Sequence, residues 1–160
     1  MTELRILAIS VSSGRVGYVF LIGKRLEGWG MSRKGSISPI AAGEVATAWI
    51  SKLRPVVVIT EEVMPRSRKG LKTRNLIDGV ALVAKQSDVL DVRVQHQQDF
   101  ENKYAEAKAL ADQFPELCPW VPKPRRIWDS EPHSMVYFEA MALAMEVLKN
   151  PSERLAAALG

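Results

Sequence analysis

The sequence predicts an α/β fold in which helices flank a mixed sheet, and three observations predict it. Three short strand-like segments follow one another at the start of the chain, an uninterrupted apolar run stands at Val56–Thr60, and helical patterns lie on both sides of that run. Consecutive short strands indicate an antiparallel meander. An apolar run without alternation is typical of a parallel strand that is covered on both faces. We therefore expect one layered domain with helices packed on the sheet.

Length and composition agree with one domain over residues 1–150 and a short tail at 151–160. The 160 residues fall within the usual size of a single domain, roughly 100–200 residues. The chain is 47% apolar and 25% charged, which excludes a globally disordered protein. The single cysteine, Cys118, excludes an internal disulfide framework and a zinc site of several thiolates. No apolar run reaches the roughly 18 residues of a membrane span, so we expect a cytoplasmic protein without a membrane partner.

The first three segments are expected to pair as antiparallel neighbours. Leu4–Val11 is largely apolar with no helical stripe, which indicates a buried strand, and a Ser-Ser-Gly turn follows it. Val16–Ile22 is rich in β-branched and aromatic residues, and the more polar Arg25–Met31 suits a sheet edge.

Helical patterns fill most of the remaining chain. Ser38 and Pro39 suit the cap and first position of a helix. The apolar residues from Phe100 to Phe114 recur at alternating spacings of 4 and 3, as in an amphipathic helix. The last helix is apolar on most faces and must be largely buried. We expect helices over about 39–53, 71–86, 100–114 and 132–149, a further strand at 89–94, and an irregular proline-rich connection at 115–126.

Three carboxylates stand at positions that suggest a role. Glu61 and Glu62 directly follow Val56–Thr60, and ligand sites in α/β sheets gather beyond the carboxyl ends of strands. Adjacent strand residues point to opposite faces, so one of the two faces such a site, unless both are solvated. Glu139 has apolar helical neighbours, and an unpaired buried carboxylate is costly. Either it pairs with a cation, for which Arg125 and Arg126 are candidates, or it is a metal ligand.

Four segments, in their order along the chain, resemble the RuvC family of Holliday-junction resolvases, which belongs to the RNase H-like (retroviral-integrase) superfamily. LAISVSSGRVGYVFL is similar to the first hairpin of that family, and VVVITEEVM is similar to its Ile-Glu-Gln-Val strand end. KGLKTRNLIDGVALVAK resembles the basic loop and helix that follow there, and FEAMALAM resembles the last helix. The resemblance covers residues 4–145. It implies an RNase H-like fold in which Leu4–Val11 is central and Val56–Thr60 lies beside it and parallel to it. It also implies metal-dependent cleavage of branched DNA with Mg²⁺ or Mn²⁺, and a homodimer.

The resemblance also assigns site residues and shows where this chain departs from the family. Glu61 and Glu139 fall on metal-binding positions, but the first-strand aspartate falls on Ser10, and another last-helix ligand falls on Val136. A neutral hydroxyl is a poorer Mg²⁺ ligand than a carboxylate. Two-metal hydrolysis needs several carboxylates around ions about 3.5–4 Å apart, so this set is depleted or has been rebuilt. The neighbours that could supply a missing ligand are Glu62, Asp129, Glu131 and His133.

Two basic segments are candidate contacts to nucleic acid. The net charge of +4 already favours polyanionic partners. Residues 65–75 hold five cations and no acid directly after Glu61 and Glu62, which suits phosphate contacts; the alternative is a solvated loop. Residues 122–128 add cations beside Trp128, which either stacks on a base or plugs the core. The candidate binding residues are Arg66, Arg68, Lys69, Lys72, Arg74, Arg125 and Arg126.

Three functions stay open on the sequence. The first is a structure-selective, Mg²⁺- or Mn²⁺-dependent endonuclease of branched or double-stranded DNA, with weak or absent activity expected. The second is a non-catalytic nucleic-acid-binding protein on the same fold, and the third is a scaffold protein. Ser10 favours the second over the first, whereas the presence of Glu61 and Glu139 favours the first. Convergence of carboxylates within metal-bridging distance in a structure would discriminate between them.

Overall fold

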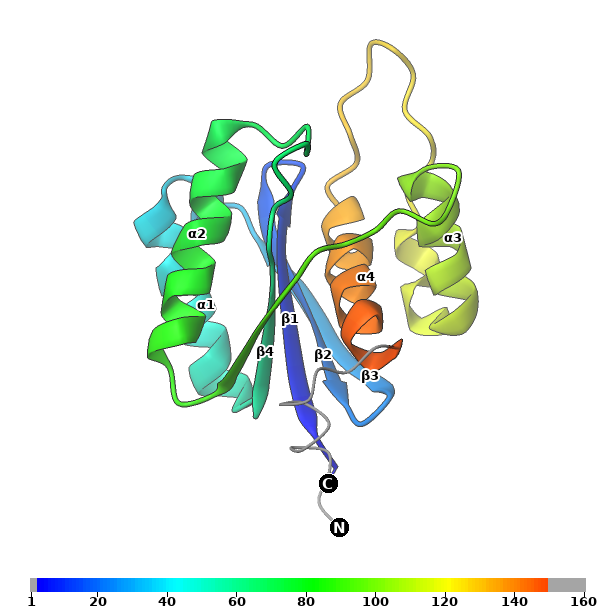
Figure 1. The fold of residues 1–160 in the computed structure, drawn as a ribbon. Helices are drawn as coiled ribbons and strands as arrows, with labels where there is room; N and C mark the ends of the chain where they lie inside the picture. The colour runs from blue at the N-terminus through cyan, green and yellow to red at the C-terminus, as the bar shows by residue number, and fades with distance from the viewer. Residues whose placement is uncertain (1–2, 150–160) are drawn as a thin grey trace.

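A computed structural model describes residues 3–149, and its core is a five-stranded mixed sheet in the order β3-β2-β1-β4-β5 (Figure 1). β1 and β2 are antiparallel, as are β2 and β3, whereas β4 pairs in parallel with β1 and β5 in parallel with β4. The central position of β1 and its parallel neighbour β4 confirm the arrangement expected from the sequence. The strands are β1 (Arg5–Ser12), β2 (Arg15–Ile22), β3 (Arg25–Ser32), β4 (Val57–Glu61) and β5 (Leu90–Val94).

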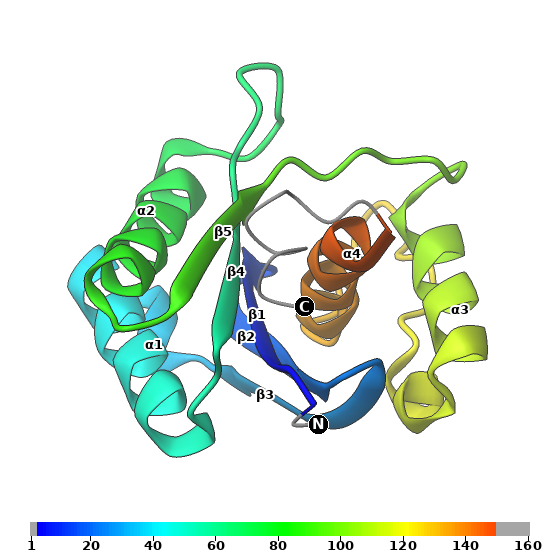
Figure 2. The same cartoon turned by 60° about the horizontal axis from the view of Figure 1, so that its bottom comes forward.

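Helices cover both faces of the sheet. One face carries α1 and α2; the other carries α4, with α3 packed outside it (Figure 2). Alternate residues of β1 point into the two resulting cores, Ile6 and Ala8 toward α4 and Leu7 and Ile9 toward α1 and α2. The helices are α1 (Pro39–Leu53), α2 (Leu71–Gln86), α3 (Lys103–Gln113) and α4 (Met135–Lys149), with short 3-10 turns at η1 (Lys34–Ser36) and η2 (Pro115–Trp120).

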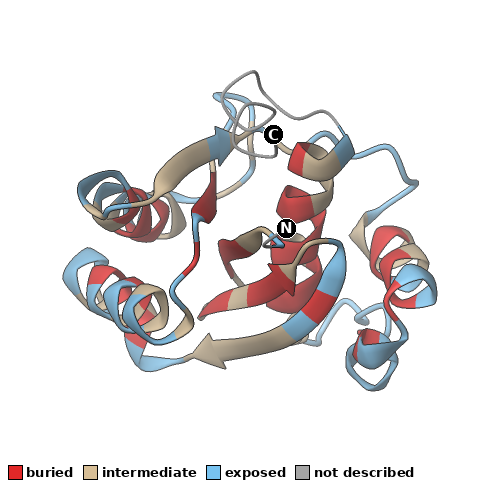
Figure 3. Cartoon of the chain, turned by 90° about the horizontal axis from the view of Figure 1, so that it is seen from below, coloured by how far each residue is buried: buried red, intermediate tan, exposed pale blue. Residues whose placement is uncertain are grey.

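The last helix is buried on most faces, as its composition predicts (Figure 3). Ten of its fifteen residues are buried. None of the helices within residues 3–149 is long and apolar enough to cross a membrane. The expected tail at 151–160 lies outside the described residues.

Side-chain caps explain where two helices begin. The Ser38 hydroxyl accepts a hydrogen bond from the backbone N–H of Ala41, so α1 starts at Pro39 as expected. The expected start of α3 at Phe100 is wrong, because Asn102 caps that helix by accepting from two backbone N–H groups. Phe100 precedes the cap and is 42% exposed. Apolar spacing therefore located this helix, but a polar side chain fixed its first residue.

Candidate functional site

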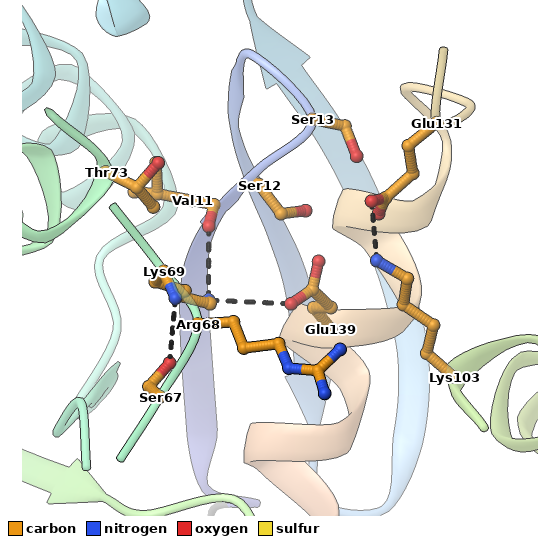
Figure 4. A pocket seen from close by; sticks show the side chains of 10 residues that line it. All are labelled: Val11, Ser12, Ser13, Ser67, Arg68, Lys69, Thr73, Lys103, Glu131 and Glu139. Atoms are coloured by element: carbon orange, nitrogen blue, oxygen red, sulfur yellow. Dashed lines mark hydrogen bonds and ion pairs between the residues drawn. The ribbon is translucent and has the colours of Figure 1, made fainter. Parts of the chain in front are cut away.

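A cavity of about 280 Å³ lies at the carboxyl ends of β1 and β4 (Figure 4). Its walls come from the turn between β1 and β2, the segment that leads into α2, the first residue of α3 and the segment around the start of α4. This is the end of the sheet at which ligand sites of α/β proteins gather. The residues that line it are Val11, Ser12, Ser13, Ser67, Arg68, Lys69, Thr73, Lys103, Glu131 and Glu139.

The ammonium group of Lys69 lies between the two predicted site glutamates. Its Nζ is 2.6 Å from Glu61 Oε1 and 3.5 Å from Glu139 Oε1, and it donates to the carbonyl oxygen of Val11 at 3.3 Å. An ammonium has three donors, and these three oxygens can take all of them. The three side chains are between 13% and 22% exposed. The structure thus brings Glu61 and Glu139 together around a lysine. The ion pair with this lysine also explains why a glutamate is tolerated on the apolar helix α4.

The charges of these two carboxylates keep Lys69 protonated. Burial on its own lowers the pKa of an ammonium, but Glu139 and Glu61 act in the opposite direction and outweigh it, so the pKa of Lys69 lies above its ordinary value. The group is therefore a fixed cation throughout the neutral range. A single positive charge is built permanently into this end of the sheet.

Ser10 is used in packing and does not line the cavity. It is 1% exposed, and its hydroxyl donates to the carbonyl oxygen of Val136 at 2.7 Å. Gly17, the cross-strand partner of Ser10 on β2, allows this approach, because a Cβ there would lie 2.6 Å from a methyl group of Val136. The positions where the resemblance expects two carboxylates thus hold a hydrogen bond that ties β1 to α4.

The residues present do not fit a two-metal site. Within residues 3–149, no three His, Cys, Asp or Glu side chains gather as a metal-binding group. Glu61 and Glu139 share one ammonium, and the Ser10 hydroxyl is engaged. Four buried oxygens at the cavity do lack a protein partner, and the space beside them is large enough for water. These atoms are Ser12 Oγ, Ser13 Oγ, Glu131 Oε1 and Glu139 Oε2.

The four further ligand candidates lie at different places. Asp129 is exposed, and its carboxylate accepts from the backbone N–H of Arg126. Glu131 lines the cavity, and its other oxygen accepts from Lys103 Nζ at 2.5 Å. His133 is exposed, and its Nδ1 donates to the carbonyl oxygen of Ser13 at 2.7 Å. Glu62 is exposed and is not among the lining residues. Sequence reasoning missed Lys103, because no pattern relates it to Glu131, which is 28 residues away.

The basic segment at 65–75 divides into structural and exposed cations. The guanidinium of Arg74 donates to the carbonyl oxygens of Lys69 at 2.8 Å and Ser67 at 3.1 Å, which braces the loop. Lys69 is engaged with the glutamates. The cations left exposed are Arg66, Arg68 and Lys72.

The second basic segment decides between alternatives that the sequence leaves open. Glu139 pairs with Lys69, so the alternative pairing with Arg125 or Arg126 is wrong; both arginines are exposed. The alternative that Trp128 plugs the core is also wrong, because its side chain is 76% exposed. Both basic segments rise at the same end of the molecule as the cavity (Figure 1).

Solved structures of known proteins resemble this chain in their fold. No family model and no curated protein matches the sequence. The structure is similar to Thermus thermophilus RuvC in complex with Holliday junction substrate, with a TM-score of 0.62 and 14% identity over 94% of this chain and 98% of that one. It is also similar to the fowlpox virus resolvase in complex with Holliday junction DNA, with a TM-score of 0.58 and 12% identity over 91% and 99%. The chain therefore has the RNase H-like fold of the Holliday junction resolvases, as expected from the sequence.

Proposed function

We propose that this protein binds branched DNA on a resolvase fold without cutting it in a metal-dependent reaction. The observation behind this proposal is the position of Lys69. Its ammonium is held by Glu61 and Glu139, the two carboxylates that the family resemblance assigns to metal. Mg²⁺ loses its water reluctantly and demands oxygen ligands in octahedral geometry. To use this pair it would have to displace a tethered cation that is held by three oxygens.

The same lysine favours DNA binding. Two carboxylates at the end of a sheet repel a phosphate backbone unless a cation lies between them. Lys69 neutralises one of the two charges without metal, and Arg68, which also lines the cavity, brings a second cation, so a phosphate can approach. Arg66, Arg68 and Lys72 are exposed on one side of it, and the loop with Arg125 and Arg126 rises on the other. Phosphate contacts of this kind give affinity without reading sequence.

The choice of branched DNA is supported by the two similar structures, which hold Holliday junctions. The homodimer implied by the family resemblance is likewise proposed, and light scattering of the free protein and of its complex with a junction would test it.

A metal-dependent endonuclease is the second candidate, and one observation favours it. Glu139 Oε2 and Glu131 Oε1 are buried beside the cavity without a hydrogen-bond partner. Free carboxylate oxygens are ligands that Mg²⁺ and Mn²⁺ prefer. The opposite oxygens of both groups are held by lysines, which is why we rank this function second.

Binding and cleavage of one labelled four-way junction separate the candidates. The protein should bind the junction in EDTA more tightly than a linear duplex of the same sequence, and it should leave the junction intact in Mg²⁺ or Mn²⁺. Metal-dependent cleavage by the wild type would establish the endonuclease instead. Equal, negligible affinity for junction, duplex and RNA would favour the scaffold protein.

The exposed cations of the basic segment should set the salt dependence. In the variant Arg66→Ala/Arg68→Ala/Lys72→Ala, the slope of log affinity against log salt should become shallower by about 2–3, because each neutralised phosphate contributes about 0.9. A matched control removes three exposed cations at the opposite end of the sheet, through Lys24→Ala/Lys52→Ala/Lys85→Ala. Equal slopes for the two variants would contradict the proposed interface.

A further inference from the structure

The segment between η2 and α4 is an exposed loop with a firm base. Residues 123–130 are all exposed and form a projecting loop (Figure 1). Its first arm starts from the buried Pro122. Its second arm is tied down by the Glu131–Lys103 ion pair and by the hydrogen bond from His133 to Ser13. The loop therefore projects from the rim of the cavity, because Glu131 and the two residues that hold this arm, Lys103 and Ser13, all line the cavity.

The tip of this loop is a closed turn that presents two large apolar side chains. The backbone N–H of Asp129 donates to the carbonyl oxygen of Arg126 at 3.0 Å, and the N–H of Arg126 donates to the Asp129 carboxylate at 3.2 Å. Ile127 and Trp128 occupy the two central positions and are 100% and 76% exposed. Gly, Asn, Asp, Pro and Ser dominate such positions. Nothing in the fold of the turn calls for an isoleucine and a tryptophan.

The chemistry around the tip fits a nucleobase within a phosphate backbone. The guanidinium of Arg126 lies 5.7 Å from the centre of the Trp128 ring, and Lys123 and Arg125 are also exposed on the loop. The carboxylate of Asp129 is engaged in closing the turn. Two apolar side chains are too small a surface for a stable protein interface, which buries about 800 Å² on each partner. Aromatic and aliphatic side chains can pack against unstacked bases, and cations beside them can contact the neighbouring phosphates.

We propose that Ile127 and Trp128 stack against unpaired or unstacked bases at the branch point of the bound DNA. This inference rests on the proposed function and adds to it the element that separates branched from linear DNA. Bases in a linear duplex already stack on each other, so a side chain must pay to separate them, whereas bases at a branch point are more easily opened. The exposed cations on both sides of the cavity contact phosphates of either DNA, and the tip contributes the preference.

Binding of matched DNAs to Trp128→Ala tests the inference. The affinity for the four-way junction should fall about tenfold, or ~1.4 kcal/mol, because stacking on one base is lost. The affinity for the linear duplex should change less than about twofold, and the salt slope on the junction should be unchanged because no phosphate contact is lost. Trp128→Phe should keep most of the junction affinity. Ile40→Ala, which truncates a side chain 76% exposed on α1, is the control and should change nothing.

Tryptophan fluorescence gives a second measurement. Emission of the wild type should be quenched by the junction more strongly than by the duplex, and Trp128→Phe should remove that difference. Equal losses of junction and duplex affinity in Trp128→Ala, or unchanged junction affinity, would overturn the inference while leaving DNA binding in place. Failure of the wild type to bind any DNA would overturn the proposed function itself. Loss of self-association in Trp128→Ala with unchanged DNA affinity would assign the tip to a second copy of the chain and overturn it as well.

Discussion

Helix α4 is held by two clusters of the same design and different chemistry. Near its start, Lys69 lies between Glu61 and Glu139; two turns further on, His96 lies between Glu106 and Glu146. His96 Nε2 is 3.0 Å from Glu106 Oε1, and its Nδ1 is 3.5 Å from Glu146 Oε1. In each cluster a cation from a connecting segment joins a glutamate of α4 to a glutamate of another element.

The two clusters differ in when their cation is charged. Lys69 stays protonated throughout the neutral range, because the pKa of an ammonium is high and the two carboxylates raise it further. His96 is charged on the acidic side of its pKa, which the hydrogen bond to Glu106 raises and burial partly lowers. The cation near the start of α4, Lys69, is therefore permanent. The cation two turns further on, His96, gains and loses its charge with pH.

Removal of the permanent cation should have the largest effect on stability. Lys69→Met leaves Glu61 and Glu139 partly buried without a cation, and breaking a buried pair from one side costs ~3–5 kcal/mol. Because the side chains keep 13–22% exposure, we expect a loss near the lower end, about 3 kcal/mol in urea unfolding. Lys72→Met removes an exposed charge in the first turn of α2 and serves as the control. A loss below that of the control would show that the cluster does not hold α4.

The titrating cation should give a smaller effect that depends on pH. The pKa of His96 is raised on folding, so its contribution is fully present below the unfolded pKa of ~6.5 and is lost as pH rises through the folded value. The wild type should therefore exceed His96→Gln by about 1 kcal/mol at pH 5.5 and match it near pH 9. Glu146→Gln should reduce this pH dependence without abolishing it, since Glu106 is the nearer partner. A difference that grows with pH would contradict the assignment.

The two clusters also show which features of the structure can be predicted from the sequence. Apolar runs and helical spacing are enough to predict a mixed sheet and the placement of Glu61 at a strand end, because burial imposes a period on the chain. The central position of β1 follows from the family resemblance. The isolated Glu139 in an apolar helix signalled a buried charge. Its partner was not predictable, since Lys69 reaches it from an irregular loop that follows no period. The sequence also leaves the exposure of Trp128 open, because a closed turn, and not hydrophobicity, decides where that side chain lies.

We propose that Lys69 and Ser10 together prevent a divalent metal from binding at this site. Thermal unfolding with increasing Mn²⁺, for the wild type and for Ser10→Asp/Lys69→Met, tests it most directly. The double variant removes the tethered cation and adds a carboxylate beside Glu61 and Glu139. It should be less stable without metal and should regain ~2.7 kcal/mol when Mn²⁺ reaches about 100 times its dissociation constant. The wild type should show no saturable shift. A saturable Mn²⁺ stabilisation of the wild type equal to that of the double variant would contradict the account.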